Sequence, residues 1–99
     1  MHKRTKAVAI TPEVRRQVEE RDGHCCIFCG KQGSGNAHVV NRSQGGLGIP
    51  ENLVTACWPC HSAMDNGQAG KLLRMKAEEY LKSIYPDWDK SKLVYDKWR

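Results

Sequence analysis

Apolar residues change their spacing along the chain, and these changes predict where its elements lie. Thr11-Pro12-Glu13 supplies a hydroxyl cap, a proline and an acid, which are typical of a helix start, and Asp22-Gly23 supplies the end of that helix. Short apolar runs at residues 37–40 and 53–55 predict two strands. From residue 71 apolar side chains recur at helical spacing until Pro86, and they predict a second helix.

Glycines and cysteines dominate the segments between these elements. Residues 33–36 are expected to be flexible, and residues 42–50, which contain three glycines, are expected to form a loop. A short helix is expected to begin over residues 61–65, with Asn66-Gly67 closing it. The pattern predicts a small α+β fold with a domain over residues 11–85, a loose basic N-terminal arm over 1–10 and a C-terminal tail over 86–99 that packs on the domain.

Length and composition bound what the chain can be. Its 99 residues are enough for one domain, which buries about 60–70% of its unfolded surface and therefore has a thin core. No apolar run approaches the ~20 residues of a membrane span, and residues 7–10 are too short for the apolar core of a signal peptide. We therefore expect a cytoplasmic protein, in which five cysteines are typical of metal ligands rather than of disulfides.

The net charge of +5 arises at the two ends of the chain. Basic residues outnumber acidic ones in residues 1–20 and 71–99, whereas residues 21–70 carry equal numbers of both. Basic flanks are typical of proteins that touch a polyanion such as nucleic acid, but a solubilising surface has the same composition. The charge alone does not decide between these interpretations.

Two cysteine pairs of matching spacing predict a metal site. Cys26-x2-Cys29 and Cys57-x2-Cys60 each offer two sulfurs from a tight turn, and together they complete the tetrahedron of a structural zinc site. Cys25 falls outside this spacing and is expected to be free. Because the core is thin, a bound metal would contribute much of the stability of the fold.

Three other interpretations of the cysteines fit less well. A disulfide framework conflicts with a reducing cytoplasm. Residues 57–60 look like a thioredoxin-type redox turn but lack its βαβ setting. With His61 they also spell the C-x-x-C-H string of haem attachment, which leaves the pair at residues 26 and 29 unexplained.

Two of the four histidines are candidates for chemistry. His61 follows Cys60, and Asp65 lies one helical turn on, so an imidazole and a carboxylate could hold a divalent cation or simply share a hydrogen bond. His38 ends a short strand, where it could be structural, but its ordinary pKa of about 6.5 suits a general base. Asn52 by itself is typical of a turn.

Taken in order, these residues resemble the HNH endonuclease family, in particular the small zinc-stapled variant common in phage and prophage genomes. The resemblance extends over residues 12–67 and rests on Arg21-Asp22-Gly23-His24-x-Cys26-x2-Cys29-Gly30, His38-Val39, Arg42-Ser43-x-Gly45-Gly46, Pro50-Glu51-Asn52-Leu53, Cys57-x2-Cys60-His61 and Asp65-Asn66-Gly67. It implies a ββα-metal (His-Me finger) core with a structural four-cysteine zinc site and flanking helices.

The resemblance also implies roles for single residues. His38 would be the general base that activates water, and Asn52 would hold the loop that orients it. His61 and Asp65 would bind one catalytic divalent cation, Mg²⁺, Mn²⁺ or similar. Ala37 stands where many members carry Asp, Glu or His as a further metal ligand, so a lower cation affinity is expected.

The sequence therefore predicts a metal-dependent DNA endonuclease or nickase that hydrolyses phosphodiester bonds. Arg42 could contact a phosphate oxygen of the DNA, or it could be an exposed loop arginine. The resemblance further fits phage packaging (terminase) proteins as partners, inside the host cell, and no membrane.

Two alternatives use the same features differently. The first is a zinc-stapled DNA-binding module of the same fold that does not cleave. The second is a protein-interaction module that uses Trp58, Trp88 and Trp98.

Overall fold

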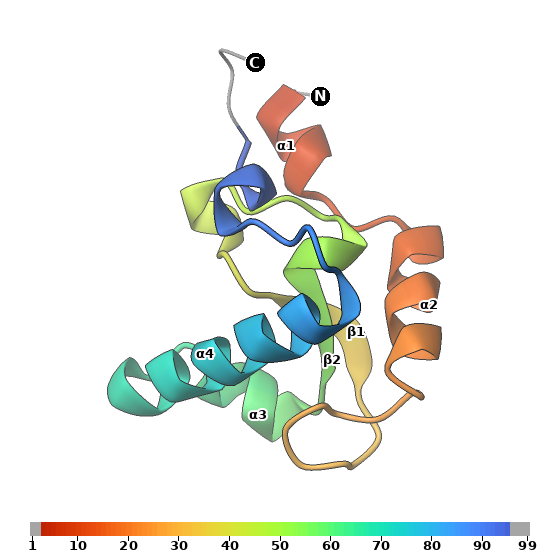
Figure 1. Cartoon of the computed structure of the whole chain (residues 1–99), viewed down its shortest axis with the longest axis vertical. Coiled ribbons are helices and arrows are strands. Elements are labelled where there is room, and N and C mark those ends of the chain that lie inside the picture. Colours follow the sequence, from red (N-terminus) through yellow and green to blue (C-terminus); the bar gives the residue numbers. More distant parts are fainter. Residues whose placement is uncertain (1–2, 96–99) are drawn as a thin grey trace.

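The computed structural model describes residues 3–95, and its elements surround a central two-stranded sheet (Figure 1). Helix α2 packs on this sheet, and α3 leaves the end of β2 and leads into α4. This mixed arrangement confirms the predicted small α+β fold. In chain order the elements are α1 (Lys3–Val8), α2 (Pro12–Arg21), β1 (Ser34–His38), β2 (Leu53–Ala56), α3 (Trp58–Ala63) and α4 (Gly67–Ile84), with 3-10 turns at Arg42–Gln44, Pro50–Asn52 and Lys90–Leu93.

Helix α2 begins and ends where the sequence predicts. The Thr11 hydroxyl oxygen accepts the backbone N–H of Val14 at 3.1 Å and so caps the first turn. Gly23 takes a φ of 68°, a left-handed conformation that glycine adopts at little cost, and the chain leaves the helix there. Val18 on the inner face is fully buried.

Helix α4 begins at Gly67, earlier than the predicted start at residue 71. Its first turn has no apolar stripe, but Gly70 is required there because a Cβ would lie 2.4 Å from the carbonyl oxygen of Met64. Farther along, Ala77 and Leu81 are fully buried, which confirms the apolar face of the helix. No helix within residues 3–95 is long and apolar enough to cross a membrane.

The sheet is one antiparallel pair with an irregular register. Ser34 lies opposite Ala56 and His38 lies opposite Leu53, with a bulge between Ser34 and Ala37. The expectation of a flexible segment over residues 33–36 is wrong, since β1 begins at Ser34. Gly35 belongs in this strand because a Cβ there would lie 2.8 Å from the carbonyl oxygen of Arg15, so glycine lets α2 approach the sheet.

Both ends of the described chain pack near the loop between the two strands. Residues 3–8, expected as a loose arm, form α1, and Val8 at its end is buried. Its neighbour Ala7 accepts the N–H of Gly48 at 3.0 Å. On the C-terminal side the N–H of Leu47 donates to the carbonyl of Leu93, a buried residue. Trp98 lies outside the described residues, and the division into arm, domain and tail stays a prediction.

A buried ion pair joins α2, β2 and α4. The Asp22 carboxylate is fully buried and accepts from the Arg21 guanidinium at 2.8 and 3.0 Å, from the Tyr80 hydroxyl at 2.6 Å and from the Thr55 N–H at 2.9 Å. Arg21 also donates to the carbonyl oxygens of Pro50 and Leu53, which flank the start of β2. The Arg21-Asp22 dipeptide of the sequence motif therefore holds the sheet in place.

Replacing Asp22 should destabilise the fold strongly. Asp22→Ala leaves the Arg21 guanidinium buried without its counter-charge, and we expect the free energy of unfolding to fall by about 3–5 kcal/mol. Chemical denaturation measures it. Lys90→Ala is the matched control, because it breaks the exposed pair with Glu78 and should cost less than about 1 kcal/mol. Equal effects of the two variants would contradict the assigned role.

The same pair predicts a pH dependence of stability. Burial by itself raises the pKa of Asp22, but hydrogen bonds from Arg21, Tyr80 and the Thr55 N–H outweigh it and hold this pKa below its ordinary value. A lowered folded pKa means that the stabilisation is complete above the unfolded pKa of about 3.9 and is lost as the pH falls through the folded value. The difference in unfolding free energy between wild type and Asp22→Ala should therefore shrink below about pH 4.

Candidate functional site

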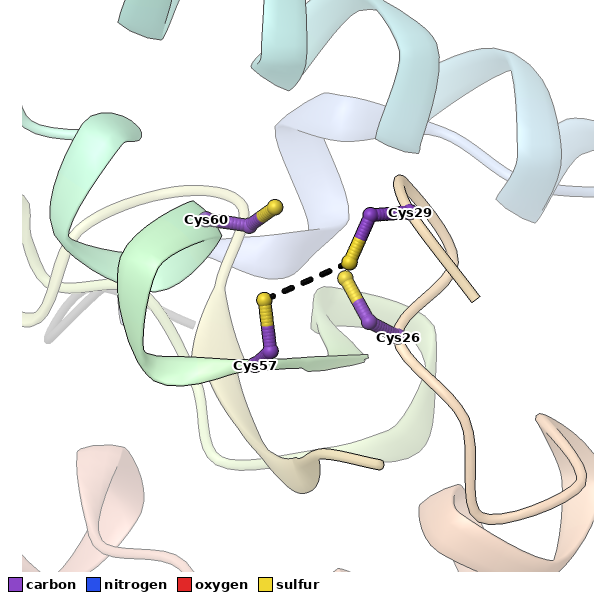
Figure 2. Close-up of side chains that lie close together, drawn as sticks. All are labelled: Cys26, Cys29, Cys57 and Cys60. Atoms are coloured by element: carbon purple, nitrogen blue, oxygen red, sulfur yellow. Dashed lines mark hydrogen bonds between the residues drawn. The ribbon is translucent and has the colours of Figure 1, made fainter. Parts of the chain in front are cut away.

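Four cysteine sulfurs converge between the 26–29 turn and the start of α3 (Figure 2). All four lie within 4.8 Å of one another, and the sulfurs of Cys29 and Cys57 are 3.4 Å apart. Zinc–sulfur bonds of ~2.3 Å in a tetrahedron place sulfurs ~3.8 Å apart, so the cluster has the size and the donor set of a zinc site. Sequence reasoning predicted this quartet: Cys26, Cys29, Cys57 and Cys60.

Local backbone geometry explains how each pair is presented. After the first pair, Gly30 takes a φ of 81° and its N–H returns to the carbonyl of Cys26 at 2.9 Å. The second pair opens α3, where Cys57 is the N-cap and Pro59 lies in the first turn. Cys25 is exposed and outside the cluster. The redox and haem interpretations involve only the second cysteine pair, so they do not explain why both pairs converge on one cluster.

The thiols of the cluster differ in acidity. Burial alone raises the pKa of Cys26, but backbone N–H groups of Cys57, Cys29 and Phe28 outweigh it and lower the value to about 7. Burial, together with hydrogen bonds to the neighbouring thiols, raises the pKa of Cys60 to about 12. A metal ion that binds all four as thiolates would therefore release protons, and its affinity would fall with falling pH.

A pocket of about 440 Å³ is lined by residues of β1, α3 and α4 and of the segments that follow β1 and α3, and these include most of the remaining candidates. His38 reaches it from the end of β1, and His61 from α3. Asp65 also lines it, but α3 ends at Ala63, so this residue lies in the following turn rather than on the helix. The structure thus brings together four residues that the sequence singled out: His38, Arg42, His61 and Asp65.

His38 is held by a contact that could not be predicted from the sequence. Its Nε2 lies 3.1 Å from the carbonyl oxygen of Val8 at the end of α1, so this nitrogen carries the proton and Nδ1 carries the free electron pair. Burial lowers the pKa of His38, and electrostatic interactions with Arg42, His61 and Arg74 add to that effect, while the Val8 carbonyl opposes it. The imidazole is therefore neutral at pH 7.

Asn52 lies outside the pocket and is fully buried. Its amide oxygen accepts the N–H of Val40 at 2.8 Å, and its amide nitrogen donates to the carbonyls of Val40 and Leu47 at 3.2 and 2.8 Å. This side chain therefore ties the loop after β1 to the start of β2. Ala37 is also fully buried and packs in the hydrophobic core, whereas Asn36 lines the pocket.

Arg74 is the pocket residue that sequence reasoning missed. It comes from α4 and pairs with Asp65 at 3.3 Å. In the sequence it is one of several basic residues on a helix, and no local pattern separates it from the others. Asp65 itself is 70% exposed, so one of its oxygens can still face the pocket.

Comparison with known proteins places the candidate residues in one family. The family model of the HNH endonucleases matches residues 26–67, which include both cysteine pairs, His38, Asn52 and His61. Residues 26–67 belong to the HNH endonuclease family. This HNH segment is somewhat less than half of the chain, and it excludes Val8 and Arg74. No curated protein and no solved structure matched the chain.

Removing one sulfur of the quartet should unfold the chain. Structural zinc contributes about 10–16 kcal/mol in comparable sites, more than a thin core can replace. We expect Cys57→Ser to lose both metal and helical content, measured by elemental analysis and circular dichroism, and a chelator to do the same to the wild type. Cys25→Ser should retain metal and fold. Loss of metal from Cys25→Ser would contradict the assigned ligand set.

Proposed function

We propose that this chain is a metal-dependent DNA endonuclease or nickase. The observation that carries the proposal is one pocket that is lined by His38, His61 and Asp65, all three from the HNH segment. Hydrolysis of a phosphodiester needs a base for the attacking water and positive charge near the leaving oxygen. The pocket offers candidates for both.

His38 is the proposed general base. Because the Nε2–H of His38 donates a hydrogen bond to the Val8 carbonyl, Nδ1 is left to accept a proton from water. The lowered pKa keeps this lone pair available at neutral pH. Asn52 supports the base indirectly, since it fixes Val40, two residues after His38, and Leu47 in the loop that faces α1.

His61 and Asp65 are the proposed ligands of the catalytic cation. An imidazole nitrogen and a carboxylate oxygen suit Mn²⁺, Mg²⁺ and similar ions, and both side chains line the same pocket. Within residues 3–95 this pair does not form part of a larger cluster of histidine, cysteine and carboxylate ligands. When bound, the cation would offset the charge that develops on the leaving oxygen.

Two further groups complete the proposal. Arg42 is exposed at the pocket, where its guanidinium can contact a phosphate oxygen of DNA. The cysteine quartet would hold a structural Zn²⁺ that takes no part in the chemistry. A phage packaging partner and a location inside a host cell stay predictions.

One observation favours a second candidate function. Ala37 is buried in the core at the position that many HNH enzymes use for another metal ligand. A DNA-binding module of the same fold, with no cleavage, would follow if His61 and Asp65 cannot hold the cation.

The endonuclease and the DNA-binding module differ in the expected effect of His38→Ala on DNA cleavage. We expect the wild type, loaded with zinc, to nick supercoiled plasmid when Mg²⁺ or Mn²⁺ is added, and His38→Ala to lose nicking while it keeps its fold and DNA affinity. His24→Ala, at an exposed histidine outside the pocket, is the control and should cut normally. A folded, zinc-loaded wild type that binds DNA but never cuts it would support the binding module instead.

The Val8 contact predicts a second loss of activity. At Gly48 a Cβ would lie 2.2 Å from the carbonyl oxygen of Ala9 and 3.0 Å from that of Val8, so Gly48→Ala must push residues 8–9 away from the loop. The His38 ring then loses its acceptor, and we expect slower nicking with unchanged zinc content. Gln44→Ala, an exposed change in the same loop, should have no effect. Normal nicking by Gly48→Ala would show that the carbonyl is dispensable.

A further inference from the structure

Arg74 uses every N–H group of its guanidinium within the protein. Its Nε donates to the carbonyl of Met64 at 3.2 Å. Its Nη1 donates to the carbonyls of His38, at 3.0 Å, and of Val39. Its Nη2 donates to the side chains of Asn41, at 2.7 Å, and Asp65, at 3.3 Å. A guanidinium has five N–H donors, so these five acceptors occupy all of them.

The acceptors belong to the two halves of the pocket. His38, Val39 and Asn41 lie at and after the end of β1, the strand that carries the proposed base. Met64 and Asp65 lie in the turn after α3. The two proposed cation ligands are Asp65 in this turn and His61 on α3 itself. Close packing at Gly70 brings the first turn of α4 against Met64, and Arg74 follows one turn later.

We propose that Arg74 is a positioning residue that fixes the proposed base, His38, relative to the proposed cation ligand Asp65. The inference rests on the proposed function and extends it to a helix outside the HNH segment. Arg74 acts through the backbone of β1 and the carboxylate of Asp65, and it does not touch DNA. The planar fork is needed because a lysine ammonium has three donors and cannot span five acceptors on two elements.

The experiment separates positioning from direct contact with DNA. Arg74→Met keeps the length of the side chain without its donors, and Arg74→Lys keeps the charge without the fork. Lys76→Met removes the same charge from an exposed position of α4 and is the matched control. Each zinc-loaded full-length variant is measured for cleavage of a labelled duplex with Mn²⁺, for DNA affinity without added cation, and for the ring signals of His38 by ¹⁵N NMR, identified from their absence in His38→Ala.

We expect Arg74→Met to lower kcat by about 10–100-fold, as the loss of groups that orient metal ligands does elsewhere, with KM and DNA affinity unchanged. The His38 signals should move, and half-maximal rate should require more Mn²⁺. Arg74→Lys should fall between Arg74→Met and wild type. Lys76→Met should match wild type in kcat and in the His38 signals.

Other outcomes overturn the proposal. A higher KM and a weaker DNA affinity with unchanged kcat would make Arg74 a phosphate contact. Unchanged kcat and unchanged His38 signals would make it a merely structural residue. If Arg74→Met loses its zinc or its fold, the same measurements on Arg74→Lys test the proposal instead. If the wild type does not cleave, the proposed function fails, and the His38 signals alone decide whether Arg74 positions this ring.

Discussion

A two-stranded hairpin is only marginally stable by itself, and in this chain the proposed base lies at the end of one. The rest of the structure supports that sheet from outside. The cysteine quartet joins the loop after α2 to the end of β2, and the buried Arg21–Asp22 pair fixes the side of β2 against α2 and α4. At the opposite end Asn52 ties the two strands through the loop between them. Helix α3 connects the cysteine quartet with the pocket, because Cys57 is its N-cap and His61 follows one turn later.

The HNH segment does not complete the pocket alone. Val8 supplies the carbonyl that orients His38, Ile10 lines the pocket beside it, and Arg74 reaches in from α4. These residues precede or follow the matched segment, so the chain on both sides contributes to the site. The hairpin and a short helix contain too few residues to enclose a pocket. The chain before and after the HNH segment therefore shields the pocket from water. His38 is buried in this way, and its burial lowers its pKa.

The features that the sequence predicted are those that a short stretch of chain determines. Cysteine spacing within a turn, the Thr11 cap and the apolar face of α4 depend on neighbours a few residues away, and each was located correctly. The wrong predictions concern residues whose conformation is determined by contacts with distant segments of the chain. In the sequence Gly35 is typical of a flexible loop, but in the structure α2 packs closely against it. Residues 3–8 show no apolar periodicity, yet they form α1, whose end packs against the loop at Gly48. The contacts of His38 and Arg74 with backbone carbonyls leave no signature in side-chain identity, so pattern reasoning could not have found them.

The charges around the pocket bear on how substrate and cation would enter it. Asp65 is the one carboxylate among the described residues that line it, and it already pairs with Arg74, while Arg42, Arg74 and two histidines supply positive or ionisable groups. Such surroundings favour an anion such as phosphate and the neutral form of His38, but they oppose a lone divalent cation. A phosphate in the pocket would supply both negative charge and oxygen ligands that His61 and Asp65 do not. For the proposed nuclease, it follows that the cation and DNA should each strengthen the binding of the other.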